Sequence, residues 1–230
     1  AQNLQGVPLG LFGASFSIAV FPVLAALAAK GENENFVKTF SVTFRQILFF
    51  IIPFSIFILV LRAQIVRVVL GAGKFDWEDT ILTFQTLGIF ALSLFAQGTI
   101  PLLARAFYAL HDTKTPFYIA LLTEIVNIGA VLLLIGKFKV IGLAIAFSSA
   151  AVFQMLLLLF VLRSRFDNLD DKNIIKFIAK IAFSSMITGF SIQLTKYLVA
   201  LLVNLDTFVG IFIQLSVSFL IGISSTILTY

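Results

Sequence analysis

The sequence contains no cysteine and a single histidine, His111, among its 230 residues. Without thiols the chain forms no disulfide and carries out no thiol chemistry, and this absence leaves the redox compartment open. A catalytic zinc site needs three protein ligands, and His111 belongs to no group of side chains with metal-ligand spacing. We therefore expect no metal site and no other cofactor.

Charged residues are scarce as well. They make up 12% of the chain, whereas hydrophobic residues make up 60% and the mean hydropathy is +1.08. An ordinary soluble domain is about 25% charged, so this chain has too few charges to cover a soluble surface. The composition excludes a soluble domain, a disordered chain and a nucleic-acid-binding module, and it predicts a polytopic membrane protein without nucleic-acid partners.

Motifs of covalent chemistry are missing too. The sequence has no GxGxxG stretch and no nucleophile elbow, and the glycines before Lys74 lack the spacing of a P-loop. We therefore expect a protein that is not an enzyme.

Long apolar runs dominate what is present. A membrane-spanning helix needs about 20 apolar residues to cross a core of roughly 30 Å, and the runs lack the alternation of barrel strands. Because lipid offers no partners to backbone polar groups, we predict an all-α protein with seven transmembrane helices. They lie at about 4–29, 42–61, 81–110, 117–135, 140–162, 178–203 and 208–230.

Basic residues are distributed unevenly between the two sides of these spans. Nine lie in connections on one side, or ten with Arg45, against six on the other. Because short cytoplasmic loops are rich in Lys and Arg, the first side is predicted to be cytoplasmic, with Ala1 external and Tyr230 cytoplasmic. An external start and an odd number of helices favour a missing preceding part of the protein. The nine are Lys30, Lys38, Arg105, Lys114, Arg163, Arg165, Lys172, Lys176 and Lys180.

The stretch Arg163–Lys180 interleaves acidic, basic and apolar residues, which is typical of a helix at the membrane interface. It predicts a boundary between residues 1–165, with five helices, and residues 166–230, with the interfacial segment and a final helix pair.

Three polar residues mark the start of the second span. Lys38, Ser41 and Arg45 share one helical face, because they are three and four residues apart. One hypothesis is a basic stripe that leads from the cytoplasm into a cavity and binds a phosphate head group, for which Arg is well suited. The alternative is an Arg that extends from the helix end toward the interface.

Glu124 lies near the middle of the fourth span, with Asn127 one turn later. An acid such as Asp at the centre of a spanning helix costs about 2.5–3.5 kcal/mol, so such residues usually face the bundle interior and have partners. Glu124 is a candidate for binding a monovalent coupling cation or for balancing Arg45. Alternatively, it is a hydrogen-bonded packing residue.

Small and hydroxyl-bearing residues form further stripes. Gly6, Gly10 and Ala14, with Gly13 beside them, favour close helix packing, and exposure of backbone to a cavity is the alternative. The face of the sixth span that includes Ser184 through Thr195 favours interhelical hydrogen bonds over a water-filled lumen.

The stretch RAFYALHDTKTP, residues 105–116, resembles a signature of the MurJ/MviN family of bacterial lipid II flippases. Physically, Asp112 and the threonines are suited to cap the next helix, and Pro116 to occupy its first position. The residues that match are Phe107, Tyr108, Asp112, Thr113, Thr115 and Pro116.

A second resemblance covers GVPLGLFGASFSIAVFPVLA and the later FRQILFFIIP. They are similar to a Pro-containing helix of this family and to the following helix, which opens with an arginine. The resemblance implies that Arg45 corresponds to an arginine that lines the central cavity and meets the lipid II pyrophosphate, with Lys38 and Ser41 beside it.

The resemblance implies a fold shared with multidrug and polysaccharide exporters, the MOP or MATE-like fold. This chain would form most of the second lobe of such a flippase together with two additional C-terminal helices. It would move lipid II, an undecaprenyl-pyrophosphate-linked disaccharide pentapeptide, to the outer leaflet of the bacterial inner membrane by alternating access. Its partners would be lipid II, membrane lipids, the missing N-terminal lobe and a monovalent cation. The alternatives are a MOP-fold exporter of another polyprenyl-linked saccharide or of drugs, and a non-transport membrane scaffold.

Overall fold

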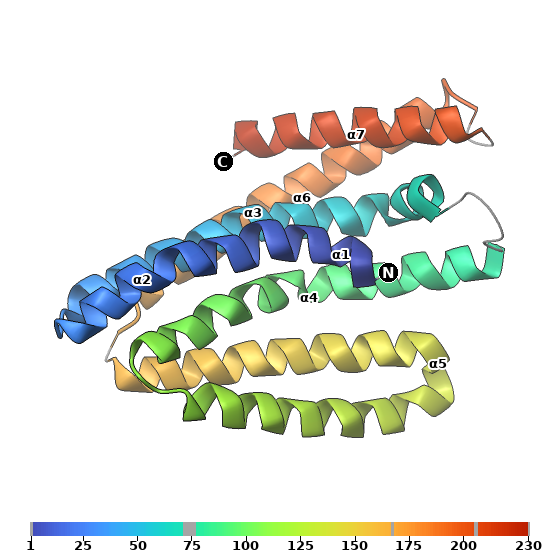
Figure 1. Ribbon diagram of the computed structural model, residues 1–230. Coiled ribbons are helices and arrows are strands. Elements are labelled where there is room, and N and C mark those ends of the chain that lie inside the picture. Colours follow the sequence, from blue (N-terminus) through green and yellow to red (C-terminus); the bar gives the residue numbers. More distant parts are fainter. Residues whose placement is uncertain (1, 71–76, 167, 205–206, 230) are drawn as a thin grey trace.

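The computed structural model describes residues 2–70, 77–166, 168–204 and 207–229, which fold into long helices joined by short turns (Figure 1). Ala1 and Tyr230, whose sides of the membrane the sequence predicts, lie outside the described residues. The elements are α1 (Gln2–Pro8), the π-helix η1 (Leu9–Ala14), α2 (Ser15–Ala29), α3 (Asn33–Leu70), α4 (Trp77–Ala109), α5 (Lys114–Arg165), α6 (Asp171–Ala200) and α7 (Phe208–Thr229).

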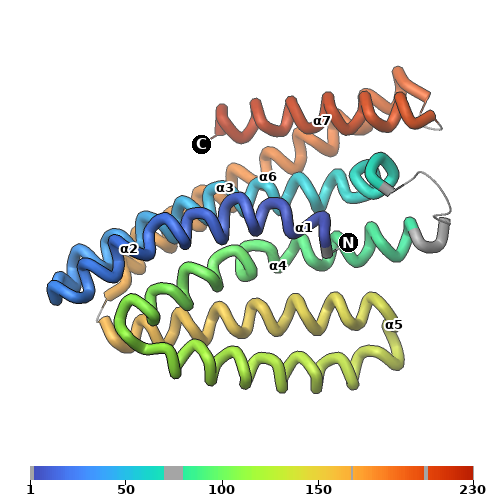
Figure 2. Tube along the Cα trace, in the orientation of Figure 1, coloured from blue at the N-terminus to red at the C-terminus, as the bar shows by residue number. Residues whose placement is uncertain are grey.

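Six stretches of the described chain are helices long and apolar enough to cross a membrane. The longest is α5, whose 52 residues would extend ~78 Å as one straight helix at about 1.5 Å per residue. Instead, the backbone leaves helical geometry at Lys139, with φ 50° and ψ −127°, and the chain folds back on itself (Figure 2). The two arms of α5 contain the predicted spans 117–135 and 140–162. Seven spans were predicted and six long helices are observed, because α5 is continuous across this bend and contains two of the predicted spans.

The core lies between α3, α4, α2 and the second arm of α5. Its fully buried side chains include Phe40 and Ile47 of α3, Leu94 and Leu102 of α4, and Leu158 of α5. Burying a large apolar side chain is worth about 1.5–3 kcal/mol relative to water, but in lipid the gain comes from close packing instead. The core fixes α3 against α4 along most of their length.

One close helix crossing joins η1 to α4. A Cβ added at Gly13 would lie 2.7 Å from the carbonyl oxygen of Gly98, which leaves no room for a side chain. Gly6 and Gly10 have open space at the same position. The predicted packing role is therefore observed at Gly13, whereas Gly10 and Ala14 line a cavity.

The C-terminal pair packs on the rest of the molecule through α3 (Figure 1). Phe57 and Leu61 of α3 form a small apolar cluster with Ile192 of α6. The predicted interfacial helix is not separate from the sixth span, because its last ten residues are the first turns of α6, which runs unbroken from Asp171. The division of the chain at residue 165 stays a prediction.

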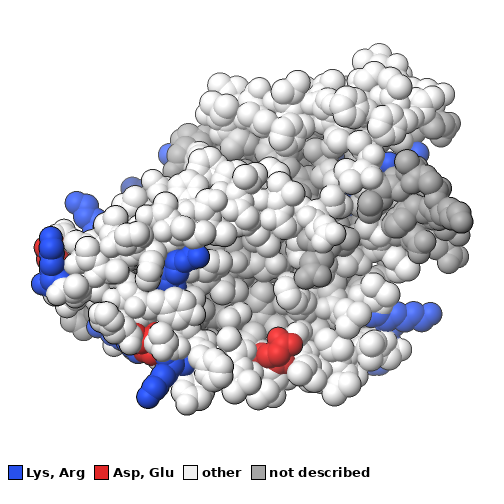
Figure 3. Space-filling view, viewed as in Figure 1, with Lys and Arg blue, Asp and Glu red and all other residues white. Residues whose placement is uncertain are grey.

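The turns alternate between the two ends of the bundle. The α2–α3 turn, the α4–α5 turn and the α5–α6 linker gather at one end, on the left of Figure 1, and the bend of α5 and the α6–α7 turn lie at the other. Lys and Arg side chains are concentrated at the left end in Figure 3 and leave much of the surface between the ends uncharged. This arrangement agrees with helices that cross a membrane in alternating directions. We call the left end the basic end.

Candidate functional site

A cavity of about 770 Å³ lies at the basic end, between the start of α3 and the linker from α5 to α6. Three basic side chains line it, those of Lys38, Arg45 and Arg165, together with the acidic Glu34 and Asp170. Charged and amide groups on its wall suit a polar, anionic ligand. The other lining residues are Asn33, Val37, Val42, Phe166, Asn168 and Asn173.

Arg45 is held at the cavity wall by its own helix and by the linker. Its Nε donates to the carbonyl oxygen of Ser41 at 3.3 Å, and its Nη2 lies 3.7 Å from Oδ2 of Asp170. The side chain remains 29% exposed, so the guanidinium can be reached from the cavity. Lys38, two turns earlier and exposed, also lines the cavity, as the shared helical face predicts.

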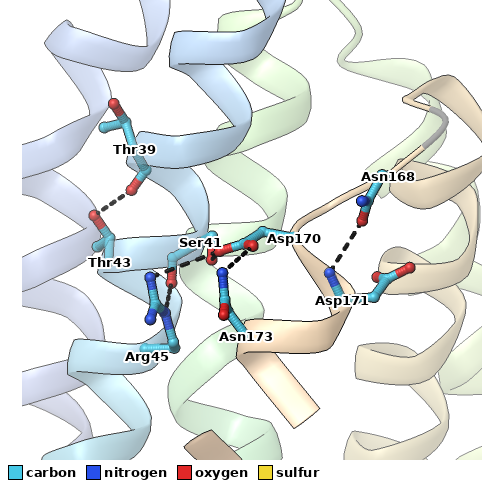
Figure 4. A network of polar contacts seen from close by, with 8 residues as sticks. All are labelled: Thr39, Ser41, Thr43, Arg45, Asn168, Asp170, Asp171 and Asn173. Atoms are coloured by element: carbon cyan, nitrogen blue, oxygen red, sulfur yellow. Dashed lines mark hydrogen bonds and ion pairs between the residues drawn. The ribbon is translucent and has the colours of Figure 1, made fainter. Parts of the chain in front are cut away.

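Ser41 does not line the cavity, although it lies on the same face as Lys38 and Arg45. The residue is fully buried, and its hydroxyl donates to Oδ2 of Asp170 at 2.7 Å (Figure 4). Ser41 therefore acts on the site through Asp170 and is not itself presented to a ligand.

The signature stretch forms the turn between α4 and α5. The carboxylate of Asp112 accepts the backbone N–H of Thr115 at 2.9 Å and its hydroxyl at 2.6 Å, and it pairs with Nη2 of Arg165. These hydrogen bonds, with the guanidinium beside them, lower the pKa of Asp112 from 3.8 to about 2. The predicted helix cap is thus observed, and it also fastens the far end of α5.

Other signature residues shape the same turn. Phe107 is fully buried, and the guanidinium carbon of Arg165 lies 5.1 Å from the centre of its ring. Tyr108 is exposed, and Thr113 makes no side-chain cap. Pro116 is the third residue of α5, so the prediction of the first position is wrong, because the helix already begins at Lys114.

Glu124 lines a second cavity, of about 420 Å³, between η1, α4 and α5. Its Oε1 accepts Nδ2 of Asn127 at 3.3 Å, and its side chain is exposed. The hypothesis that Glu124 balances Arg45 is wrong, because the ion pair of Arg45 in the described structure is with Asp170. Two buried oxygens nearby, Oδ1 of Asn127 and Oγ1 of Thr123, have no hydrogen-bond partner among the described residues.

Comparison with known proteins decides the family. The family model for the lipid II flippase MurJ matches residues 1–218. The chain belongs to this family. It is 30% identical over 197 residues to the lipid II flippase MurJ of Thermosipho africanus, and 29% identical over 196 residues to the probable lipid II flippase MurJ of Thermotoga maritima.

A solved structure of a lipid II flippase MurJ in an inward closed conformation has the same architecture. The TM-score is 0.78 at 29% identity, and the match covers 97% of this chain and 43% of that one. The two relatives above are matched over 86% and 85% of this chain and 39% of their own length. The chain therefore spans about two fifths of the length of the curated MurJ relatives it matches.

The all-α membrane fold and the MurJ family were both predicted from the sequence and are confirmed. Several residues that line the cavity were missed, among them Asp170 and Arg165. Asp170 and Arg165 read as ordinary charges of a surface linker, and their partners lie 129 and 53 residues away. Spacing along a single helix or turn does not indicate contacts between residues so far apart in the sequence.

The hydroxyl stripe on α6 faces α7 in this MurJ family member. Ser184 pairs with Thr229 at 2.6 Å, and Thr188 pairs with Thr226 at 3.0 Å. These interhelical hydrogen bonds are the interpretation that the sequence favoured over a lumen. In the described part of the chain, no group of three or more His, Asp or Glu residues could hold a metal ion.

Proposed function

We propose that this chain forms most of the second lobe of a lipid II flippase, together with the additional C-terminal pair. With a first lobe, it would move lipid II from the inner to the outer leaflet of the bacterial cytoplasmic membrane by rocking around a central cavity. The observation that carries the proposal is the basic cavity beside Arg45, set in a MurJ fold.

The cavity supplies a path for the head group. Exposed Lys38 would attract the anionic pyrophosphate from the cytoplasm, and Arg45 would bind it with charge that cannot be titrated away. Hydrogen bonds between a guanidinium and phosphate oxygens are short and directional. The isoprenoid tail would stay in lipid, and no covalent bond would change, so the activity is transport and not enzymatic catalysis.

The proposed orientation places the basic end in the cytoplasm, because basic loops remain inside. Moving an anionic head group outward is then favoured by an inside-negative membrane potential, by about 2.3 kcal/mol per charge per 100 mV. This driving force acts only if the head group crosses as an anion. Basic side chains in the cavity favour the ionised form of the head group and so meet this condition.

A monovalent cation would bind at Glu124. The support is chemical: one carboxylate, together with the unpartnered oxygens of Thr123 and Asn127, lines a cavity beside helix α4. Pro101, on the same wall, has no N–H to donate to the carbonyl of Gln97, so that carbonyl is another candidate oxygen ligand. Hard cations prefer such oxygen ligands.

The proposal is tested by replacing Arg45 in the full-length protein. Arg45→Ala should abolish growth of cells depleted of their own lipid II flippase, whereas Arg45→Lys should retain part of it because one charge remains. Arg163→Ala is the matched control, because Arg163 lies at the same end but pairs with Asp171 outside the cavity. Normal growth with Arg45→Ala at native expression would refute the assigned role.

A further inference from the structure

The carboxylate of Asp170 joins α3 to α6, because its Oδ2 faces α3 and its Oδ1 faces the first turn of α6. Oδ2 accepts the hydroxyl of Ser41 at 2.7 Å and lies 3.7 Å from Nη2 of Arg45, while Oδ1 accepts Nδ2 of Asn173 at 2.6 Å (Figure 4). The carboxylate thus presents an anion to Arg45 and to hydrogen-bond donors on two sides. A phosphate oxygen in the cavity would find the same partners in Arg45 and Asn173.

The position of Asp170 in the chain makes this arrangement unusual. It is the residue before α6, where an Asp side chain normally accepts a backbone N–H from the first turn of its own helix. Asp170 makes no such cap, and its backbone is left-handed, with φ 65°. Only Gly, Asn and Asp enter that region at small cost. One oxygen of the carboxylate is therefore directed to Ser41 and Arg45 of α3, and the carboxylate binds no backbone N–H of its own helix.

We propose that Asp170 is an internal anion that occupies the phosphate subsite on Arg45, and that the phosphate of the substrate head group displaces it. This inference rests on the proposed function of the cavity. An anionic head group has more charge and more acceptor oxygens than one carboxylate, so it wins the competition for Arg45. Displacement also removes the repulsion between the carboxylate and the incoming phosphate.

The displaced carboxylate has a second place to bind. In the first turn of α6, the backbone N–H of Lys172 has no acceptor among the described residues, and it is one of the N–H groups that an N-cap Asp accepts. Leu169 and Ile174, on either side, are buried in the core and hold the linker in place. The movement is therefore confined to Asp170 and its exposed neighbours, and it couples arrival of the head group to the start of α6.

The test compares binding of undecaprenyl pyrophosphate to the purified full-length protein in detergent. Asp170→Asn removes the competing charge, keeps an acceptor for Ser41 and tolerates the left-handed backbone, so we expect binding about two- to fivefold tighter, the range of one partly exposed ion pair. Asp171→Asn is the matched control, because it makes the same change of charge one residue away. Asp171 pairs with Arg163 at 2.8 Å, so the affinity of the Asp171→Asn variant for undecaprenyl pyrophosphate should stay unchanged. Equal or weaker binding by Asp170→Asn would overturn the inference.

A second measurement uses the absence of cysteine from this chain. A fluorophore on Lys172→Cys, an exposed position beside Asp170, should change its emission when undecaprenyl pyrophosphate is added to the full-length protein, with any cysteine of the other lobe replaced. Binding without a change in emission would overturn the displacement. If binding itself is unaffected by Arg45→Ala, the proposed function fails, whereas an Arg45-dependent affinity that Asp170→Asn does not raise refutes only the role of Asp170.

Discussion

The carboxylate of Asp112, in the turn between α4 and α5, forms an ion pair with the guanidinium of Arg165, at the end of α5. The pair thereby links the last residue of α5 to the turn that precedes its first residue. Because Arg165 also lines the cavity beside Arg45, the turn positions one wall of the candidate head-group site. The signature stretch therefore has a structural role, and it affects the candidate site through the position of Arg165.

Asp112 makes stability depend on pH in the acid range. Because the pKa of its carboxyl is lowered in the folded protein from 3.8 to about 2, the stabilisation is fully present above the unfolded value and is lost as the pH falls through about 2. Asp112→Asn should be less stable than the original protein near pH 6, and the difference should shrink toward pH 2. Thermal unfolding in detergent between pH 6 and pH 2 measures it, and a difference independent of pH would contradict the assignment.

Gly13 should not tolerate even one added carbon. The Cβ of Gly13→Ala would lie 2.7 Å from a backbone oxygen of Gly98, so the helices must separate, at a cost of about 1–3 kcal/mol. Gly6→Ala, with open space at the same position, should cost nothing. Unfolding of both variants in detergent and denaturant measures the difference, and equal stability of the two would contradict the crossing.

The fold was largely predictable from the sequence. Each apolar run of spanning length forms a helix by itself, and the close packing of the Gly-rich first stretch was predicted from small residues near one another in the chain. The break between the fourth and fifth spans was also predicted, and it coincides with the bend at Lys139. For the candidate site, helical spacing predicted only that Lys38 and Arg45 of α3 share a face, and both line the cavity. Asp170 was not predicted, because only the fold brings the linker against Ser41.

Glu124 should make thermal stability respond to a monovalent cation. A bound ion stabilises the folded state by about 2.7 kcal/mol at a hundred times its dissociation constant. We expect NaCl to raise the unfolding temperature over choline chloride at equal ionic strength, and Glu124→Gln to lose the response. Glu32→Gln, at the α2–α3 turn and away from this cavity, should keep it. A response that survives in Glu124→Gln would rule out this site.

Single cysteines should separate the cavity from the packed interior, because the chain has none of its own. Lys38→Cys and Arg45→Cys should react with a membrane-impermeant maleimide applied from the cytoplasmic side. Thr188→Cys should not react from either side, because Thr188 is fully buried between α6 and α7. Labelling of Thr188→Cys, or protection of both cavity positions, would contradict the arrangement.

The central claim is that Arg45 binds the head group during translocation. It is tested most directly by measuring how much lipid II becomes reachable at the outer surface of cells depleted of their own flippase. The original full-length protein should restore outward lipid II, Arg45→Lys should restore part of it, and Arg45→Ala should leave it at the depleted level. Full restoration by Arg45→Ala, at equal amounts of protein in the membrane, would contradict the account.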